Sequence, residues 1–109
     1  MSDTSNATHS RIDSLVKGHD IVLFMKGSAN FPMCGFSGRA IQILKAVGVD
    51  TKGITTVNVL DDPEIRQGIK EYSNWPTIPQ LYVKGEFIGG SDIMMEMYES
   101  GELQQVMNT

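Results

Sequence analysis

The chain has 109 residues, of which 40% are hydrophobic and 20% charged, and its net charge is −4. This length suits one domain with its own buried core, and we expect residues 1–109 to form a single domain. The negative charge argues against general nucleic-acid binding, which needs a basic surface, and no apolar run approaches the length of a membrane span. The polar start lacks the apolar core of a signal peptide, so we expect residues 1–8 to be a flexible tail and the protein to be cytoplasmic.

Apolar spacing and turn residues divide the first half of the chain into helix, strand and helix. Residues 9–18 carry apolar side chains at helical spacing, and residues 21–26 are a short apolar run typical of a buried strand. Turn-forming residues occupy 27–33. An amphipathic helix then follows Cys34 and stops at Gly48.

The second half begins with a strand and a capped helix. Residues 55–60 alternate and are rich in β-forming types, which predicts a strand. Asp61 or Asp62 then caps a helix that has Pro63 in its first turn. Residues 73–79 are a loop.

A hairpin and a last helix complete the pattern. Residues 80–83 and 86–88 predict two strands around a short turn, and Ser91 or Asp92 caps the helix that follows. The first strand–helix–strand unit should be parallel, with a right-handed crossover, and the hairpin antiparallel. This order predicts an α/β fold in which helices flank a mixed four-stranded sheet.

Cys34 is the only cysteine, and it opens the sequence Cys-Gly-Phe-Ser where a loop becomes a helix. The unpaired N–H groups and the dipole of a helix N-terminus favour an anion, so we expect the thiol pKa to lie below its usual value of about 8.5. Ser37 stands where a Cys-x-x-Cys motif has its second cysteine, and redox work would therefore need a thiol from outside. The alternative is a buried structural cysteine.

Residues 75–79, Trp-Pro-Thr-Ile-Pro, form the second motif. Pro79 opens a strand, where its missing N–H does least harm. If the bond before it is cis, the backbone of Ile78 faces its surroundings, and a peptide-like ligand can pair there as an added strand. Cis bonds occur at only ~5–6% of X–Pro positions, so a trans proline in a plain turn is the alternative.

Residues 89–92, Gly-Gly-Ser-Asp, form the third motif. The glycines allow close approach, the helix N-terminus suits a carboxylate, and Asp92 suits an ammonium group. An α-amino-acid end carries both groups. Helix capping by Ser91 or Asp92 is an equally good explanation. Lys26 and Arg66 are further candidates, with solvated surface charges as the alternative.

Together these three motifs, in this order and spacing, resemble monothiol (CGFS-type) glutaredoxins of the single-domain bacterial or organellar type. The resemblance covers nearly the whole chain after its first few residues, and it implies a thioredoxin-like fold that binds glutathione. It also implies the contacts: Lys26 and Arg66 with the glycine carboxylate, the backbone of Ile78 with the cysteinyl part, and Ser91 and Asp92 with the γ-glutamyl end. Cys34 would face the glutathione sulfur.

The resemblance further implies a 2Fe–2S cluster held between two copies of the chain. Cys34 and one glutathione from each copy would supply the thiolates, and the homodimer would serve cluster storage, cluster transfer and iron homeostasis. BolA-type proteins and cluster-receiving proteins are the implied partners. Two alternatives stay open. One is a glutathione-dependent thiol–disulfide oxidoreductase with Cys34 as its catalytic residue, an activity usually weak in this branch. The other is an iron-responsive interaction module that works through a BolA-type partner.

Overall fold

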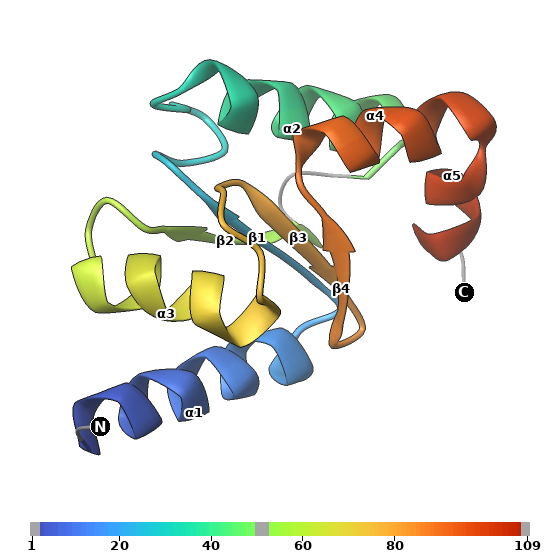
Figure 1. Cartoon of the computed structure of the whole chain (residues 1–109). Coiled ribbons are helices and arrows are strands. Elements are labelled where there is room, and N and C mark those ends of the chain that lie inside the picture. Colours follow the sequence, from blue (N-terminus) through green and yellow to red (C-terminus); the bar gives the residue numbers. More distant parts are fainter. Residues whose placement is uncertain (1–2, 50–52, 108–109) are drawn as a thin grey trace.

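The helices and strands alternate along the chain much as the sequence predicts (Figure 1). A computed structural model describes residues 3–49 and 53–107. The elements in chain order are α1 (Asp3–Gly18), β1 (Ile21–Met25), α2 (Gly35–Ala46), β2 (Thr55–Asn58), α3 (Pro63–Ser73), β3 (Gln80–Val83), β4 (Glu86–Gly89), α4 (Ser91–Ser100) and α5 (Glu102–Met107). No helix in this part of the chain combines the length and apolar character that crossing a membrane requires.

The four strands form a mixed sheet in the order β2-β1-β3-β4. β1 runs parallel to β2, with Val22 opposite Thr55, and antiparallel to β3. β3 and β4 form the antiparallel hairpin. The predicted mixed four-stranded sheet flanked by helices is therefore confirmed.

Helices cover both faces of this sheet, α2 and α4 on one side and α1 and α3 on the other (Figure 1). The side chains of β1 divide between the two layers. Leu23 and Met25 pack with α2, α4 and α5, whereas Val22 and Phe24 pack with α1 and α3. Because both faces of this central strand are buried, its sequence is a continuous apolar run.

α1 begins earlier than the sequence predicts. Residues 3–8, expected in the flexible tail, belong to this helix, while residues 1 and 2 lie outside the described residues. Thr8 is buried, and it lies where a Cβ on Gly68 would come within 2.7 Å of its methyl group. Because Gly68 has no side chain, α1 can approach α3 closely. Residues 3–8 have no apolar pattern from which this long-range contact could be predicted.

The helix caps settle two alternatives that the sequence left open. Asp62 is the N-cap of α3, since its carboxylate accepts hydrogen bonds from the N–H groups of Glu64 and Ile65 at 3.1 Å. The N-cap of α4 is Gly90, with no side-chain cap. The prediction that Ser91 or Asp92 caps α4 is therefore wrong, because both residues already lie inside the helix.

Candidate functional site

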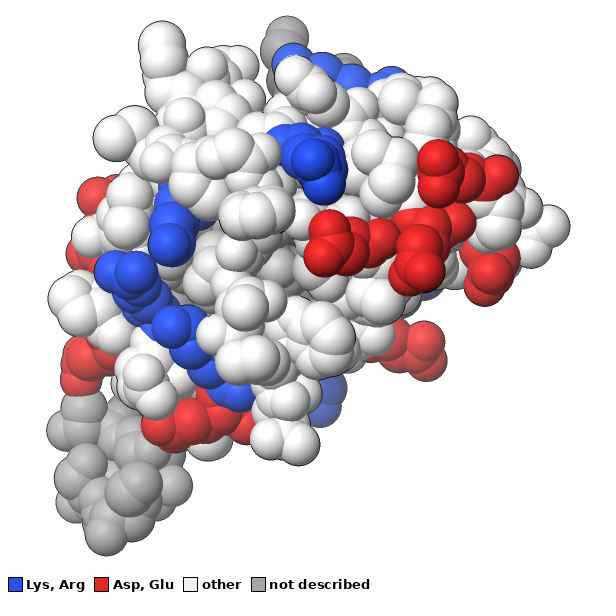
Figure 2. All heavy atoms as spheres, turned by 45° about the horizontal axis from the view of Figure 1, so that its top comes forward, with Lys and Arg blue, Asp and Glu red and all other residues white. Residues whose placement is uncertain are grey.

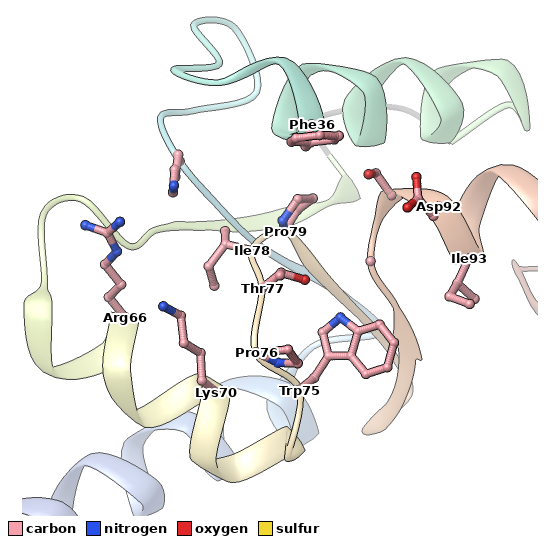
Figure 3. Close-up of a pocket in the computed structure, with 13 residues that line it drawn as sticks. Phe36, Arg66, Lys70, Trp75, Pro76, Thr77, Ile78, Pro79, Asp92 and Ile93 are labelled. Carbon is pink, nitrogen blue, oxygen red and sulfur yellow. The ribbon is translucent and has the colours of Figure 1, made fainter.

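A pocket of about 380 Å³ lies between α3, the loop before β3 and the N-terminus of α4 (Figure 3). Its lining comes from separate parts of the chain: Lys26, Phe36, Arg66, Lys70, Trp75, Pro76, Thr77, Ile78, Pro79, Gly90, Ser91, Asp92 and Ile93. The fold thus brings together all five residues that the sequence singled out for glutathione, which are Lys26, Arg66, Ile78, Ser91 and Asp92.

Cys34 is the N-cap of α2 and lies beside this pocket rather than in its lining. Its half-buried sulfur borders an adjoining hollow together with Met33, Arg39 and Met95. Phe36, two residues after Cys34, extends over the pocket (Figure 3). The thiol therefore stands at the rim, between the pocket and the open hollow.

The surroundings of Cys34 favour its thiolate form. Burial alone would raise the pKa of the thiol, but hydrogen bonds from the Ser37 hydroxyl and N–H, an N–H of Phe36 and the charge of Lys26 outweigh it and lower the pKa. The Ser37 N–H donates to the sulfur at 3.3 Å. The predicted lowering of the pKa at this helix start is therefore supported by named donors.

One end of the pocket is cationic. Lys26 follows the end of β1, and Arg66 and Lys70 stand one turn apart on α3, where residues four apart share a helix face. No carboxylate of the described residues pairs with any of the three. Lys70 was not singled out from the sequence, although its spacing from Arg66 is a usable signal.

The opposite end of the pocket is formed by the start of α4. Ser91 is buried there, and the Asp92 side chain is 87% exposed, with its carboxylate 3.8 Å from the guanidinium of Arg39. Figure 3 shows Asp92 across the pocket from Arg66. On the face drawn in Figure 2, a run of basic side chains lies to the left and a group of acidic side chains to the right, with further acidic side chains along the left edge.

A buried glutamine holds the loop between the two ends. The Gln80 side-chain amide donates to the carbonyls of Trp75 and Thr77, both at 3.1 Å, and Gln80 has no exposed surface. The Ile78–Pro79 peptide bond is cis. A cis bond here is what the sequence analysis requires for the backbone of Ile78 to face its surroundings and pair with a peptide-like ligand. Nothing in the sequence singles out Gln80, because its partners are backbone carbonyls, which every residue carries.

Comparison with known proteins identifies the family. Residues 21–88 match the model of the glutaredoxin family. The chain belongs to this family. A ycf64-like monothiol glutaredoxin of Synechocystis sp. is 57% identical over 100 residues, which are 92% of this chain and 91% of that protein. The mitochondrial monothiol glutaredoxin-5 of Schizosaccharomyces pombe is 53% identical over 103 residues, 94% of this chain and 70% of that protein.

Solved structures agree with the fold of this glutaredoxin. The solution structure of reduced apo GrxS14 from poplar has a TM-score of 0.80 at 46% identity, covering 99% of this chain and 100% of that one. The holo form of poplar glutaredoxin C1 has a TM-score of 0.85, covering 98% and 92%, but at 22% identity it supports the fold alone. The predicted thioredoxin-like fold and the resemblance to monothiol glutaredoxins are confirmed.

Proposed function

We propose that this glutaredoxin binds glutathione in the pocket between α3 and α4. The observation that carries the proposal is the opposite character of the two ends. Lys26, Arg66 and Lys70 suit the glycine carboxylate, whereas the N–H groups at the start of α4 and the carboxylate of Asp92 suit the amino-acid group of the γ-glutamyl end. Between them, the backbone of Ile78 suits the peptide-like middle of the ligand.

We further propose that Cys34 and the glutathione thiol together hold a 2Fe–2S cluster as cargo. The donor set fits, because iron–sulfur clusters bind thiolates and the hydrogen bonds around Cys34 favour that form. One chain supplies one cysteine and one glutathione pocket, so two copies are needed for the usual four thiolates. Half of these ligands would be held without covalent bonds to the protein, which suits a carrier that releases its cluster.

The wider roles depend on this cargo. Cluster storage, cluster transfer and iron homeostasis follow if the cluster binds, and a BolA-type protein or a recipient protein stays a predicted partner. The cytoplasm stays a prediction. The relatives do not share one location, since they include a cyanobacterial protein and ones named mitochondrial and chloroplastic. The single domain over residues 1–109 also stays a prediction.

Anaerobic reconstitution tests the proposal. The apo protein is incubated with iron, sulfide and glutathione, and iron and sulfide are then quantified per chain. We expect one 2Fe–2S cluster per two chains, a dimer that a chelator returns to monomers, and no cluster on the Cys34→Ser variant. A cluster that forms equally well without added thiol, or colour that sediments with a monomer, would contradict the model.

The lowered pKa of Cys34 also favours a second function, glutathione-dependent thiol–disulfide exchange. In this reaction the thiolate takes glutathione from a mixed disulfide, the substrate leaves as a thiol, and a second glutathione releases glutathione disulfide from Cys34. Turnover of a glutathionylated peptide, compared with the Cys34→Ser variant, measures this activity. The interaction module remains a prediction without an observation of its own.

A further inference from the structure

An ion pair joins α2 to α4 at the edge of the pocket. The guanidinium of Arg39 lies 3.8 Å from one carboxylate oxygen of Asp92, and α2 packs beside α4. Arg39 borders the adjoining hollow with Cys34 and Met95, whereas Asp92 lines the pocket. The pair therefore connects the two depressions, and its acidic member belongs to the site proposed for glutathione.

The carboxylate of Asp92 is otherwise poorly restrained. Its side chain is 87% exposed in the first turn of α4 (Figure 3), so it loses conformational freedom when a ligand fixes it. Immobilising an exposed side chain lowers affinity, because the lost entropy counts against binding. A carboxylate that is already held toward the pocket avoids part of this loss.

The geometry of the pair leaves Asp92 able to bind a ligand. At 3.8 Å, the contact between Arg39 Nη1 and Asp92 Oδ1 is an ion pair longer than a hydrogen bond. A carboxylate offers about four acceptor sites on its two oxygens, and this contact engages one oxygen. An ammonium group can therefore bind Asp92 without displacing Arg39.

The positive charge of Arg39 does not oppose a γ-glutamyl end. The α-amino-acid group of this end carries an ammonium and a carboxylate, so its net charge is zero. The guanidinium repels the first and attracts the second, and solvent weakens both interactions at an exposed site. The two effects largely cancel, which leaves the hold of Arg39 on Asp92 as its main contribution.

We propose that Arg39 is a positioning residue for the γ-glutamyl end of glutathione, because it holds the carboxylate of Asp92 toward the ammonium group of the ligand. Arg39 borders the hollow rather than the pocket, so it acts through Asp92 and does not itself bind the ligand. The pocket then selects ligands with a free α-amino group. This inference deepens the proposed function and rests on it.

Calorimetry on the apo protein tests this role with two ligands. Glutathione carries the α-amino group, and glutaryl-cysteinyl-glycine is the same molecule without it. Arg39→Gln removes the positive charge, Arg39→Lys keeps it, and Lys45→Gln removes a positive charge from the last turn of the same helix. Arg39→Gln is also combined with Asp92→Asn, which lacks the carboxylate.

We expect Arg39→Gln to weaken glutathione binding about twofold to fivefold, the range for an exposed ion pair. Its affinity for glutaryl-cysteinyl-glycine should equal that of the wild type. Arg39→Lys should recover part of the loss, and Lys45→Gln should match the wild type with both ligands. In the Asp92→Asn protein, Arg39→Gln should have no further effect, because the group that it positions is gone.

Three results would overturn this inference alone. Tighter glutathione binding by Arg39→Gln would mean that the arginine competes with the ammonium group. Equal losses with both ligands would mean that Arg39 acts on another part of the ligand. Unchanged glutathione affinity would mean that the ion pair does not position Asp92. A wild-type protein that binds no glutathione would overturn the proposed function as well.

Discussion

The hydroxyl of Ser37 lies 3.4 Å from the sulfur of Cys34. The same hydroxyl oxygen accepts a hydrogen bond of 3.0 Å from the backbone N–H of Lys26 and, while the thiol is protonated, one from the Cys34 S–H. Once the thiol is ionised, the hydroxyl proton of Ser37 is donated to the thiolate, which lowers the pKa of Cys34. Ser37 is completely buried. The serine at the position of a second cysteine therefore stabilises the thiolate as a donor, and it links the sulfur to Lys26, a cation of the pocket.

Ser37→Ala should raise the pKa of Cys34, because a hydrogen bond that favours the thiolate is lost. At neutral pH a smaller fraction of the thiol is then ionised, and alkylation of the apo protein slows. The midpoint of the alkylation rate against pH should move to higher pH than in the wild type.

Ser28→Ala is the matched control for this change. The Ser28 hydroxyl accepts from the N–H of Phe31 and has no contact with the sulfur, so its removal should leave the midpoint in place. Equal midpoints for Ser37→Ala and the wild type would show that the backbone N–H groups and Lys26 are sufficient.

Lys26→Ala, Arg66→Ala and Lys70→Ala should each weaken glutathione binding by about 1–3 kcal/mol, the range for a well-formed charge-assisted contact. Calorimetry on the apo variants measures the loss. The difference from wild type should nearly vanish with glutathione esterified at its glycine carboxylate, since that ester lacks the charge that the cations bind. Lys45→Ala, in the last turn of α2, is the control and should bind normally.

Equal losses with glutathione and with its ester would contradict this orientation of the ligand. The cations would then act on the ligand's overall charge, or on the shape of the pocket, rather than on the glycine end.

Asp62 should make stability depend on pH. A hydrogen bond from the Arg11 guanidinium at 2.9 Å, together with backbone N–H groups of Ile65 and Glu64, lowers the pKa of this carboxyl. A lowered folded-state pKa adds stability above the unfolded value of about 3.9, and this stability is lost as pH falls through the folded value. Asp62→Asn keeps a capping oxygen without the charge, so the gap between the two proteins in urea unfolding should close below about pH 4.

Asp62→Ala also removes the cap of α3 and should cost about 0.5–2 kcal/mol at neutral pH. If the free energies of unfolding of wild type and Asp62→Asn differ by the same amount from neutral to acidic pH, the ion pair with Arg11 adds no stability to the folded protein. Because Arg66 and Lys70 lie on α3, both variants should also be tested for glutathione affinity.

Gly68→Ala should destabilise the protein, although alanine favours a helix by about 1 kcal/mol over glycine. The new Cβ would lie 2.7 Å from the Thr8 methyl group and 3.2 Å from the Ile12 side chain, and overpacking of this kind costs about 1–3 kcal/mol. Thermal or urea unfolding measures the change. Adding Thr8→Ser, which removes the methyl group, should recover part of the loss. A Gly68→Ala protein more stable than wild type would mean that α1 moves away at no cost.

Local signals in the sequence predicted much of this protein. Apolar spacing located β1 and the body of α2, and turn residues located the hairpin after Gln80. The sequence also predicts Cys34 at a helix start, because a loop rich in turn formers ends there, and Cys34 is the N-cap of α2. These features depend on neighbours within a few positions, which the sequence shows directly.

Only the tertiary structure decided the features that depend on distant partners. The early start of α1 follows from the contact between Thr8 and Gly68. The pocket brings together Lys26 and Asp92, and the buried Gln80 holds its loop through backbone carbonyls. Residue types and spacing identify most of these side chains as candidate site residues. Whether they lie in one pocket depends on how α3 and α4 pack on the sheet. Such packing is set by contacts between segments far apart in the chain, and no local pattern encodes it.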